Sequence, residues 1–215
     1  MSEQSGGAVP GRGFKLSDQA GVHSPRFSAV AEVIRERRSN PNVDPERPIP
    51  REVVDQLLTL AVEGPNHYRT NPYRFVVLSG PARARIGEVA AEATARKGGD
   101  NVAALVERQR SQFVRASTVI VVAAAPDEDP VKHFENKYAA VAGGYAITLG
   151  ATAAGIASYW RSGLAMIDPQ VSAAVKEAIG LAPTDEIVGF LSLGYPTGQP
   201  GAREYPPPTV LHLDS

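Results

Sequence analysis

Residues 117–124, Ser117-Thr118-Val119-Ile120-Val121-Val122-Ala123-Ala124, form a nearly continuous run of β-branched and small apolar side chains. Such a run without polar alternation predicts a strand buried on both faces. Two more strands are predicted at residues 73–79 and 186–194, and helical stretches of uneven length separate the three. Because helices outnumber strands, we expect a three-layer α/β/α sandwich of the α+β class.

The helices are predicted from apolar positions that recur every three or four residues. The first begins near Phe27, with Ser28 as a cap, and ends in an arginine-rich cluster. The longest contains many Ala and Gly residues, which allow a neighbouring helix to approach closely, as in an oligomer interface. Residues 158–163 are expected to form a turn. The remaining helices are predicted at residues 51–62, 82–96, 102–113, 134–155 (the longest) and 169–179.

Length and composition exclude several classes of protein. The 215 residues suit one domain, expected at residues 27–215, and the Gly-, Ser- and Pro-rich residues 1–26 are expected to form a flexible arm. A net charge of -1 gives no field that would attract nucleic acid or an anionic membrane. The chain has no cysteine and no signal-peptide pattern, so the predicted compartment is the cytoplasm.

Common site motifs are absent from the sequence. The chain has no Gly-x-Gly-x-x-Gly after a strand, no Walker sequence and no Gly-x-Ser-x-Gly elbow. Its four histidines lack metal-ligand spacing, and Asp127-Glu128-Asp129 is expected to be a solvated turn. No metal site is therefore predicted.

Two basic segments have the chemistry of a phosphate site. Arg35-Glu36-Arg37-Arg38-Ser39 and Trp160-Arg161-Ser162-Gly163 each place a guanidinium beside a hydroxyl, and planar guanidinium groups match phosphate oxygens. Each segment also has a structural explanation, a solvated helix end in the first case and a packed turn in the second. A third candidate is His67, in a polar loop before the strand at residues 73–79.

The order and spacing of four segments resemble one family. They are Arg37-Arg38-Ser39; Pro65-Asn66-His67 with Asn71-Pro72-Tyr73-Arg74-Phe75; Gly155 through Trp160-Arg161-Ser162-Gly163; and Ile187 to Gly194. The chain from about Val33 to Gly194 resembles the nitroreductase-like FMN-dependent oxidoreductases, in particular their short single-domain NAD(P)H nitroreductases. The resemblance implies a mostly antiparallel central sheet and an intertwined homodimer with two FMN sites, each built from both chains.

The resemblance also assigns roles to individual residues. Arg37, Arg38 and Ser39 match the contacts to the phosphate, ribityl chain and flavin edge. His67 and Asn71 match the flavin-contacting loop, in which the family's Gln-Pro-Trp is Asn71-Pro72-Tyr73 here. The second FMN segment is matched by Trp160, Arg161 and Ser162, and a stretch attributed to NADH or NADPH binding is matched by Gly150, Ala151, Thr152, Ala153, Ala154 and Gly155.

Two departures from the family pattern concern charge. Glu63 stands where short relatives have an arginine that contacts FMN across the dimer. Arg69 stands where many longer relatives have an asparagine near the flavin. We therefore expect Arg69 to tune substrate preference.

The chemistry implied by the resemblance needs no catalytic side chain, because the flavin carries the hydride. NADH or NADPH would pass a hydride to flavin N5 and leave, and a small organic acceptor of the nitroaromatic, quinone or enone class would then enter the same pocket. This is ping-pong kinetics. Two alternatives are a non-catalytic FMN-binding carrier or sensor dimer, and a helical interaction protein whose arginines are merely solvated.

Overall fold

The computed structural model describes residues 24–202 and 204–213 and divides the chain into two compact units. One unit contains α1 (Pro25–Glu36) and the described residues from 201 onward, and the other contains residues 37–200. Most of the predicted arm, residues 1–23, lies outside the described residues, so the arm and the single domain at 27–215 stay predictions. In the second unit the elements are α2 (Arg51–Ala61), η2 (His67–Arg69), β1 (Tyr73–Ser79), α3 (Pro81–Lys97), α4 (Val102–Gln112), β2 (Thr118–Ala124), α5 (Pro130–Ala153), β3 (Ala157–Arg161), α6 (Leu164–Ile167), α7 (Pro169–Ile179) and β4 (Glu186–Gly194).

The first helix begins earlier than its apolar spacing suggests. Its cap is Ser24, whose hydroxyl accepts a hydrogen bond from the backbone N–H of Phe27 at 3.1 Å. Ser28 lies inside the helix and is not the cap.

The sheet of the second unit is antiparallel throughout, in the order β1-β2-β4-β3. All seven residues of β2 are buried, as its unbroken apolar run predicts. The predicted turn at residues 158–163 is wrong, because residues 157–161 form β3 and pair with β4. Glycine and serine around this five-residue strand concealed its alternation, in which Tyr159 and Arg161 lie on one face and Trp160 on the other.

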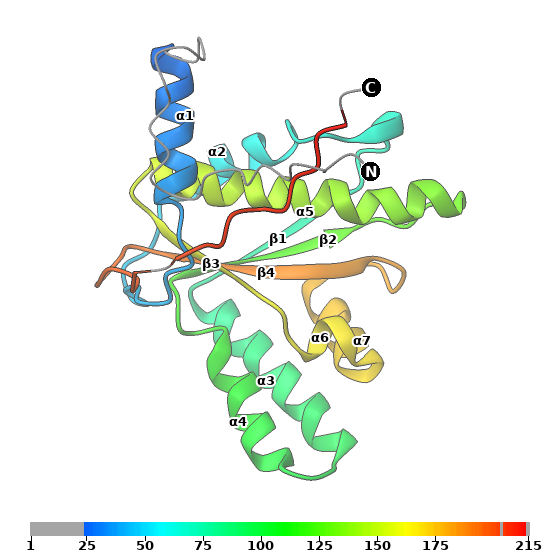
Figure 1. Ribbon diagram of the computed structural model, residues 1–215. Helices are drawn as coiled ribbons and strands as arrows, with labels where there is room; N and C mark the ends of the chain where they lie inside the picture. The colour runs from blue at the N-terminus through cyan, green and yellow to red at the C-terminus, as the bar shows by residue number, and fades with distance from the viewer. Residues whose placement is uncertain (1–23, 203, 214–215) are drawn as a thin grey trace, which may run out of the picture. The chain divides into compact units, whose positions relative to one another are not determined.

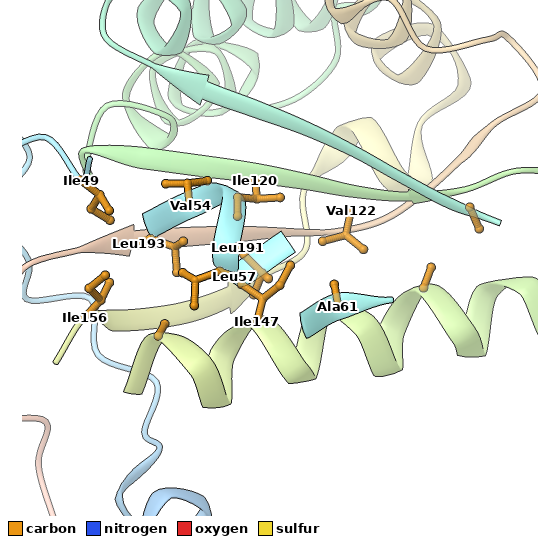
Figure 2. Packing of buried hydrophobic residues seen from close by; sticks show 13 residues of the cluster. Ile49, Val54, Leu57, Ala61, Ile120, Val122, Ile147, Ile156, Leu191 and Leu193 are labelled. Atoms are coloured by element: carbon orange, nitrogen blue, oxygen red, sulfur yellow. The ribbon is translucent and has the colours of Figure 1, made fainter. Parts of the chain in front are cut away.

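Helices cover both faces of the sheet, which confirms the three-layer α+β architecture. On one face α2 and α5 pack against Ile120, Val122 and Leu191 (Figure 2). On the other face α3, α4, α6 and α7 surround a second cluster that includes Val119, Val121 and Phe190 (Figure 1). Within the described residues, no helix has the length and apolar character needed to cross a membrane.

The glycines of α5 permit close packing inside this unit. A Cβ added to Gly143 would lie 2.7 Å from the carbonyl oxygen of Ala61, and one added to Gly150 would lie 2.7 Å from a methyl group of Leu60. The small residues at these positions therefore bring α5 against α2.

Asp168 joins α3 to α7 through charge. Its carboxylate accepts hydrogen bonds from the backbone N–H groups of Gln170 and Val171 at the start of α7, and from Lys97 on α3. The Lys97 ammonium, with help from these N–H groups, lowers the pKa of Asp168. This carboxylate therefore stabilises the fold above the unfolded-state pKa, and its contribution is lost as pH falls through the lower native pKa.

We expect Asp168→Asn to lower Tm by a few degrees at pH 7, because the amide keeps the cap acceptor but loses the ion pair. The difference from the wild type should shrink as pH falls below about 4, since Asp168 is then increasingly protonated in both native and unfolded chains. Thermal unfolding between neutral and acidic pH measures this. A constant Tm difference across that range would show that the charge is not responsible.

Candidate functional site

The segment after α1 is held against the edge strand of the sheet. Ser39 forms an isolated parallel bridge with Ser158, and the backbone N–H of Asn40 donates to the Ser158 carbonyl at 3.0 Å. The Asn40 side chain is buried and donates to the carbonyl of Gly198 at 2.8 Å. These bonds bring Arg37-Arg38-Ser39 next to β3, which contains Trp160 and Arg161 and is followed directly by Ser162.

Trp160 lies on the α5 face of the sheet. A Cβ added to Gly144 would lie 2.3 Å from its indole, and so would one added to Gly189 on β4. The ring is therefore enclosed between two backbones that approach closely only because neither residue has a side chain. This places the indole in the packing between sheet and helix, and its predicted contact with FMN stays a prediction.

Arg161 points to the opposite face, toward α4. Its Nε donates to Ser192 Oγ at 3.2 Å and its Nη1 to Gln112 Oε1 at 2.9 Å. Its guanidinium carbon lies 5.3 Å from the ring centre of Phe113 and 5.8 Å from that of Phe190. The third nitrogen, Nη2, is buried and has no hydrogen-bond partner among the described residues.

The charge of Arg161 is not balanced locally. Burial lowers its pKa, and the nearby cations Arg115 and Arg108 lower it further. The hydrogen-bond acceptors that hold the guanidinium, Gln112 and Ser192, are neutral. A half-buried cation with a buried, unused donor is costly, and an anionic ligand would remove that cost.

A cavity of about 510 Å³ opens beside Arg161, and we call it the arginine pocket. Of the predicted site residues it contains Trp160, Arg161 and Ser162, the last of which is exposed. Its lining residues are Pro41, Arg108, Gln112, Arg115, Tyr159, Trp160, Arg161 and Ser162.

The sequence analysis missed the contribution of α4 to this pocket. Gln109 and Gln112 are both buried. The side-chain nitrogen Nε2 of Gln112 donates to Gln109 Oε1, while Gln112 Oε1 accepts from Arg161. The sequence does contain a signal for this contribution. Gln109 and Gln112 are three residues apart on the inward side of α4, where buried polar side chains need hydrogen-bond partners.

The loop that contains His67 forms a second group of predicted residues. His67 Nδ1 lies 2.7 Å from Glu135 Oε2 on α5, and its ring stacks on Tyr68 at 3.8 Å between ring centres. Thr70 donates its hydroxyl proton to Asn136 Oδ1 at 2.6 Å. These contacts fix the loop to the first turns of α5.

Three non-glycine residues of this loop adopt left-handed backbone conformations. The φ angles are 62° at Tyr68, 53° at Arg69 and 48° at Asn71. Such conformations are costly for residues with a Cβ, and asparagine tolerates them best. Arg69 and Asn71 are exposed, so the loop presents both predicted residues to their surroundings. Concentrated strain of this kind is typical of functional segments.

Within one chain the two groups of residues stay apart. His67 contacts Glu135, whereas Trp160 contacts Gly144, nine residues further along the same helix. At 1.5 Å per residue this separation is about 13 Å. Figure 1 shows η2 at the first turns of α5 and β3 toward the other end of that helix.

In the predicted nicotinamide-binding stretch, residues 150–155, the first two residues are packed against other residues and the last three are exposed. Gly150 contacts Leu57 and Leu60, and Ala151 is fully buried. The last three residues, Ala153, Ala154 and Gly155, are exposed. Packing explains Gly150 and Ala151, and a role of the stretch in NADH or NADPH binding stays a prediction. No cluster of residues that could hold a metal ion occurs in the described part of the chain.

Comparison with known proteins identifies the family of this chain. The model of the nitroreductase family matches residues 34–195. The chain belongs to the nitroreductase family. The expected recognition and enzyme class are thereby confirmed at the level of the family, whose members are oxidoreductases.

Individual nitroreductase relatives extend the likeness over most of the chain. "Putative NAD(P)H nitroreductase YdjA" of Escherichia coli K12 is 32% identical over 146 residues, which cover 67% of this chain and 76% of the relative. A nitroreductase-like family protein from Bacillus cereus superposes with a TM-score of 0.71 at 25% identity, covering 83% of this chain and 91% of that one. A Bacteroides fragilis nitroreductase crystallised with bound FMN gives a TM-score of 0.70 at 21% identity, covering 86% and 98%.

Proposed function

We propose that this protein is an FMN-dependent oxidoreductase that takes electrons from NADH or NADPH and reduces a small organic acceptor of the nitroaromatic, quinone or enone class. The observation that carries the proposal is the pairing of Ser39 with Ser158, which sets two separate phosphate-type segments side by side. Relatives named as NAD(P)H nitroreductases and a structural neighbour with bound FMN support it.

The donor groups at this place fit the phosphate end of FMN. The buried Nη2 of Arg161 is a donor without a partner among the described residues, and the exposed Ser162 adds a hydroxyl to the lining of the same cavity. A phosphate or ribityl oxygen would satisfy such donors, and charge-assisted hydrogen bonds to guanidinium groups are the strong ones. Arg37, Arg38, Ser39, Arg161 and Ser162 are therefore the residues that would hold this end of the cofactor.

The side chains have positioning and electrostatic tasks in this function. FMN, when bound, supplies the hydride-carrying centre, which no amino-acid side chain offers. Arg37, Arg38 and Arg161 would neutralise its phosphate, and the exposed Arg69 would face the acceptor. Successive use of one pocket by donor and acceptor would give ping-pong kinetics.

A second copy of the chain would complete each site. Phe134, Tyr138, Val141 and Tyr145 follow one face of α5 at spacings of four, three and four residues, and all four are exposed. The rings of Phe134 and Tyr138 meet edge to face with 4.8 Å between centres. We infer that this aromatic stripe packs against its copy and brings the His67 loop of one subunit to the arginine pocket of the other.

Tyr138→Arg is expected to convert the dimer to a monomer, because the new charge would have to be buried in an apolar interface. Light scattering coupled to gel filtration measures the mass. Flavin content should fall with it, since the two groups of site residues are separated within one chain. Ile167→Arg is the control, because Ile167 is an exposed apolar residue on α6, away from the stripe and outside the lining of the arginine pocket. A dimeric Tyr138→Arg protein with full flavin content would contradict the shared site.

The function is tested first by the absorption spectrum of the purified protein, which should show bound flavin. Anaerobic stopped flow with NADH and then NADPH should bleach that absorption, and a set of nitroaromatic, quinone and enone acceptors should restore it. Bound flavin that neither donor bleaches at any concentration would favour the carrier or sensor. A colourless protein that does not take up FMN would exclude both flavin-based functions.

A further inference from the structure

Two arginines of the arginine pocket belong to none of the segments that resemble cofactor-binding motifs. Arg108 lies on α4, and Arg115 lies in the turn that follows this helix. Both line the cavity together with Arg161, and Gln112 lies between them in sequence and holds the Arg161 guanidinium at 2.9 Å. Three cations, from α4, from the turn that follows it and from β3, thus face one space.

These three cations have no acidic partner among the described residues. Arg161 donates to Gln112 and Ser192, and Arg115 donates to the hydroxyl of Ser111 at 3.2 Å. The side chain of Arg108 has no hydrogen bond or ion pair within the described part of the chain. By contrast, Arg110 on the same helix pairs with Glu88 at 2.8 Å and Glu107 at 3.0 Å. On α4, the arginine whose side chain lacks a partner, Arg108, is therefore the one that lines the cavity.

A phosphate group matches this arrangement better than a carboxylate. It carries up to two negative charges and three terminal oxygens, so several guanidinium groups can donate to it at once. A cavity of about 510 Å³ also leaves room for the molecule that carries the phosphate. The unpartnered Nη2 of Arg161 supplies one buried donor at the inner wall.

We propose that Arg108 and Arg115 bind a phosphate group in the arginine pocket together with Arg161. The proposal rests on the function proposed above, because both FMN and the nicotinamide donor carry phosphates. Arg108 and Arg115 bind and orient the phosphate electrostatically, and no bond is made or broken at these residues.

The test compares Arg108→Gln/Arg115→Gln with Arg85→Gln/Arg96→Gln. The control pair lies on α3 and removes the same two charges away from the cavity. The cofactor-free proteins are titrated with FMN and with riboflavin, which lacks the phosphate, while flavin fluorescence is recorded. The FMN-loaded proteins are then titrated with NADPH and with NADH under anaerobic conditions, and thermal unfolding is followed with millimolar inorganic phosphate or with chloride at equal ionic strength.

If the FMN phosphate occupies the pocket, the pocket pair should reduce the preference for FMN over riboflavin at least tenfold, and the control pair should not. If the extra phosphate of NADPH occupies it, the preference for NADPH over NADH should fall at least tenfold while the flavin preference stays. In either case phosphate should raise the Tm of the cofactor-free wild type more than that of the pocket pair.

The proposal is overturned when both preferences of the pocket pair stay within twofold of the wild type. A phosphate-dependent Tm with unchanged preferences would mean an adventitious ion only, and it overturns the proposal too. If the wild-type protein still binds FMN and transfers electrons from NADH or NADPH to an acceptor, the proposed function stands even though the phosphate proposal fails. The experiment therefore distinguishes failure of this proposal from failure of the proposed function. Both Arg108 and Arg115 are exposed, so the double variant should fold. If the double variant does not fold, the two single variants are measured in its place.

Discussion

Arg37→Ala combined with Arg161→Met is expected to yield a protein that loses most of its FMN during purification. Each arginine would contribute charge-assisted hydrogen bonds of about 1.5–3 kcal/mol, so affinity should fall about a hundredfold or more. Methionine at position 161 keeps an apolar chain against Phe113 and Phe190, whose ring centres lie 5.3 Å and 5.8 Å from the present guanidinium carbon. Flavin content per chain and the dissociation constant for added FMN are the measurements.

The control for this pair is Arg35→Ala combined with Arg85→Ala. Both residues are exposed, and neither lies in a segment that resembles the cofactor motifs. The control removes the same charge and should retain wild-type flavin content. Full occupancy in the Arg37 and Arg161 variant would show that the phosphate binds elsewhere in the protein.

Gly189→Ala is expected to destabilise the fold by about 1–3 kcal/mol, the usual cost of overpacking a filled core. The added methyl would lie 2.3 Å from the Trp160 ring, which cannot move away because Gly144 backs its other side equally closely. Elsewhere in a strand the same change should stabilise, because alanine restricts the unfolded chain. A loss of stability in Gly189→Ala would therefore show that the Trp160 ring is enclosed, whereas a gain would show that it is not.

Chemical denaturation of Gly189→Ala, Trp160→Leu and the double variant measures the coupling between the two positions. The alanine should cost less, or become stabilising, once leucine leaves room for it. Gly64→Ala serves as the control glycine, since its added Cβ would meet no atom closer than 3.5 Å. Additive free energies of unfolding in the cycle would contradict the enclosure.

The layers of the fold could be predicted from the sequence because their patterns are local. The unbroken apolar run of β2 and the spacing of Val54, Leu57 and Ala61 in α2 both correspond to observed buried faces. The strand β3 could not be found in the same way. It has only five residues, and its pairing with β4 and with Ser39 depends on segments far away in the chain.

The candidate site was predictable only where chemistry was concentrated in short segments. Arg37-Arg38-Ser39 and Trp160-Arg161-Ser162 stand out by composition, and the structure brings these two segments together. Arg108 and Arg115 have the same charge as many solvated helix residues, so nothing local distinguishes them from Arg110. What distinguishes them is the cavity, which is a property of the tertiary fold.

The length of α5 is constrained at both groups of site residues. Glu135 meets His67 near its beginning, Gly144 meets Trp160 in its middle, and Gly150 meets Leu57 and Leu60 near its end. One inserted residue would rotate everything beyond it by about 100° and shift it by about 1.5 Å. Side chains would then occupy the places where the glycines now face their neighbours. The contacts along α5 therefore fix the number of residues between its contact points as well as the types of residue at them.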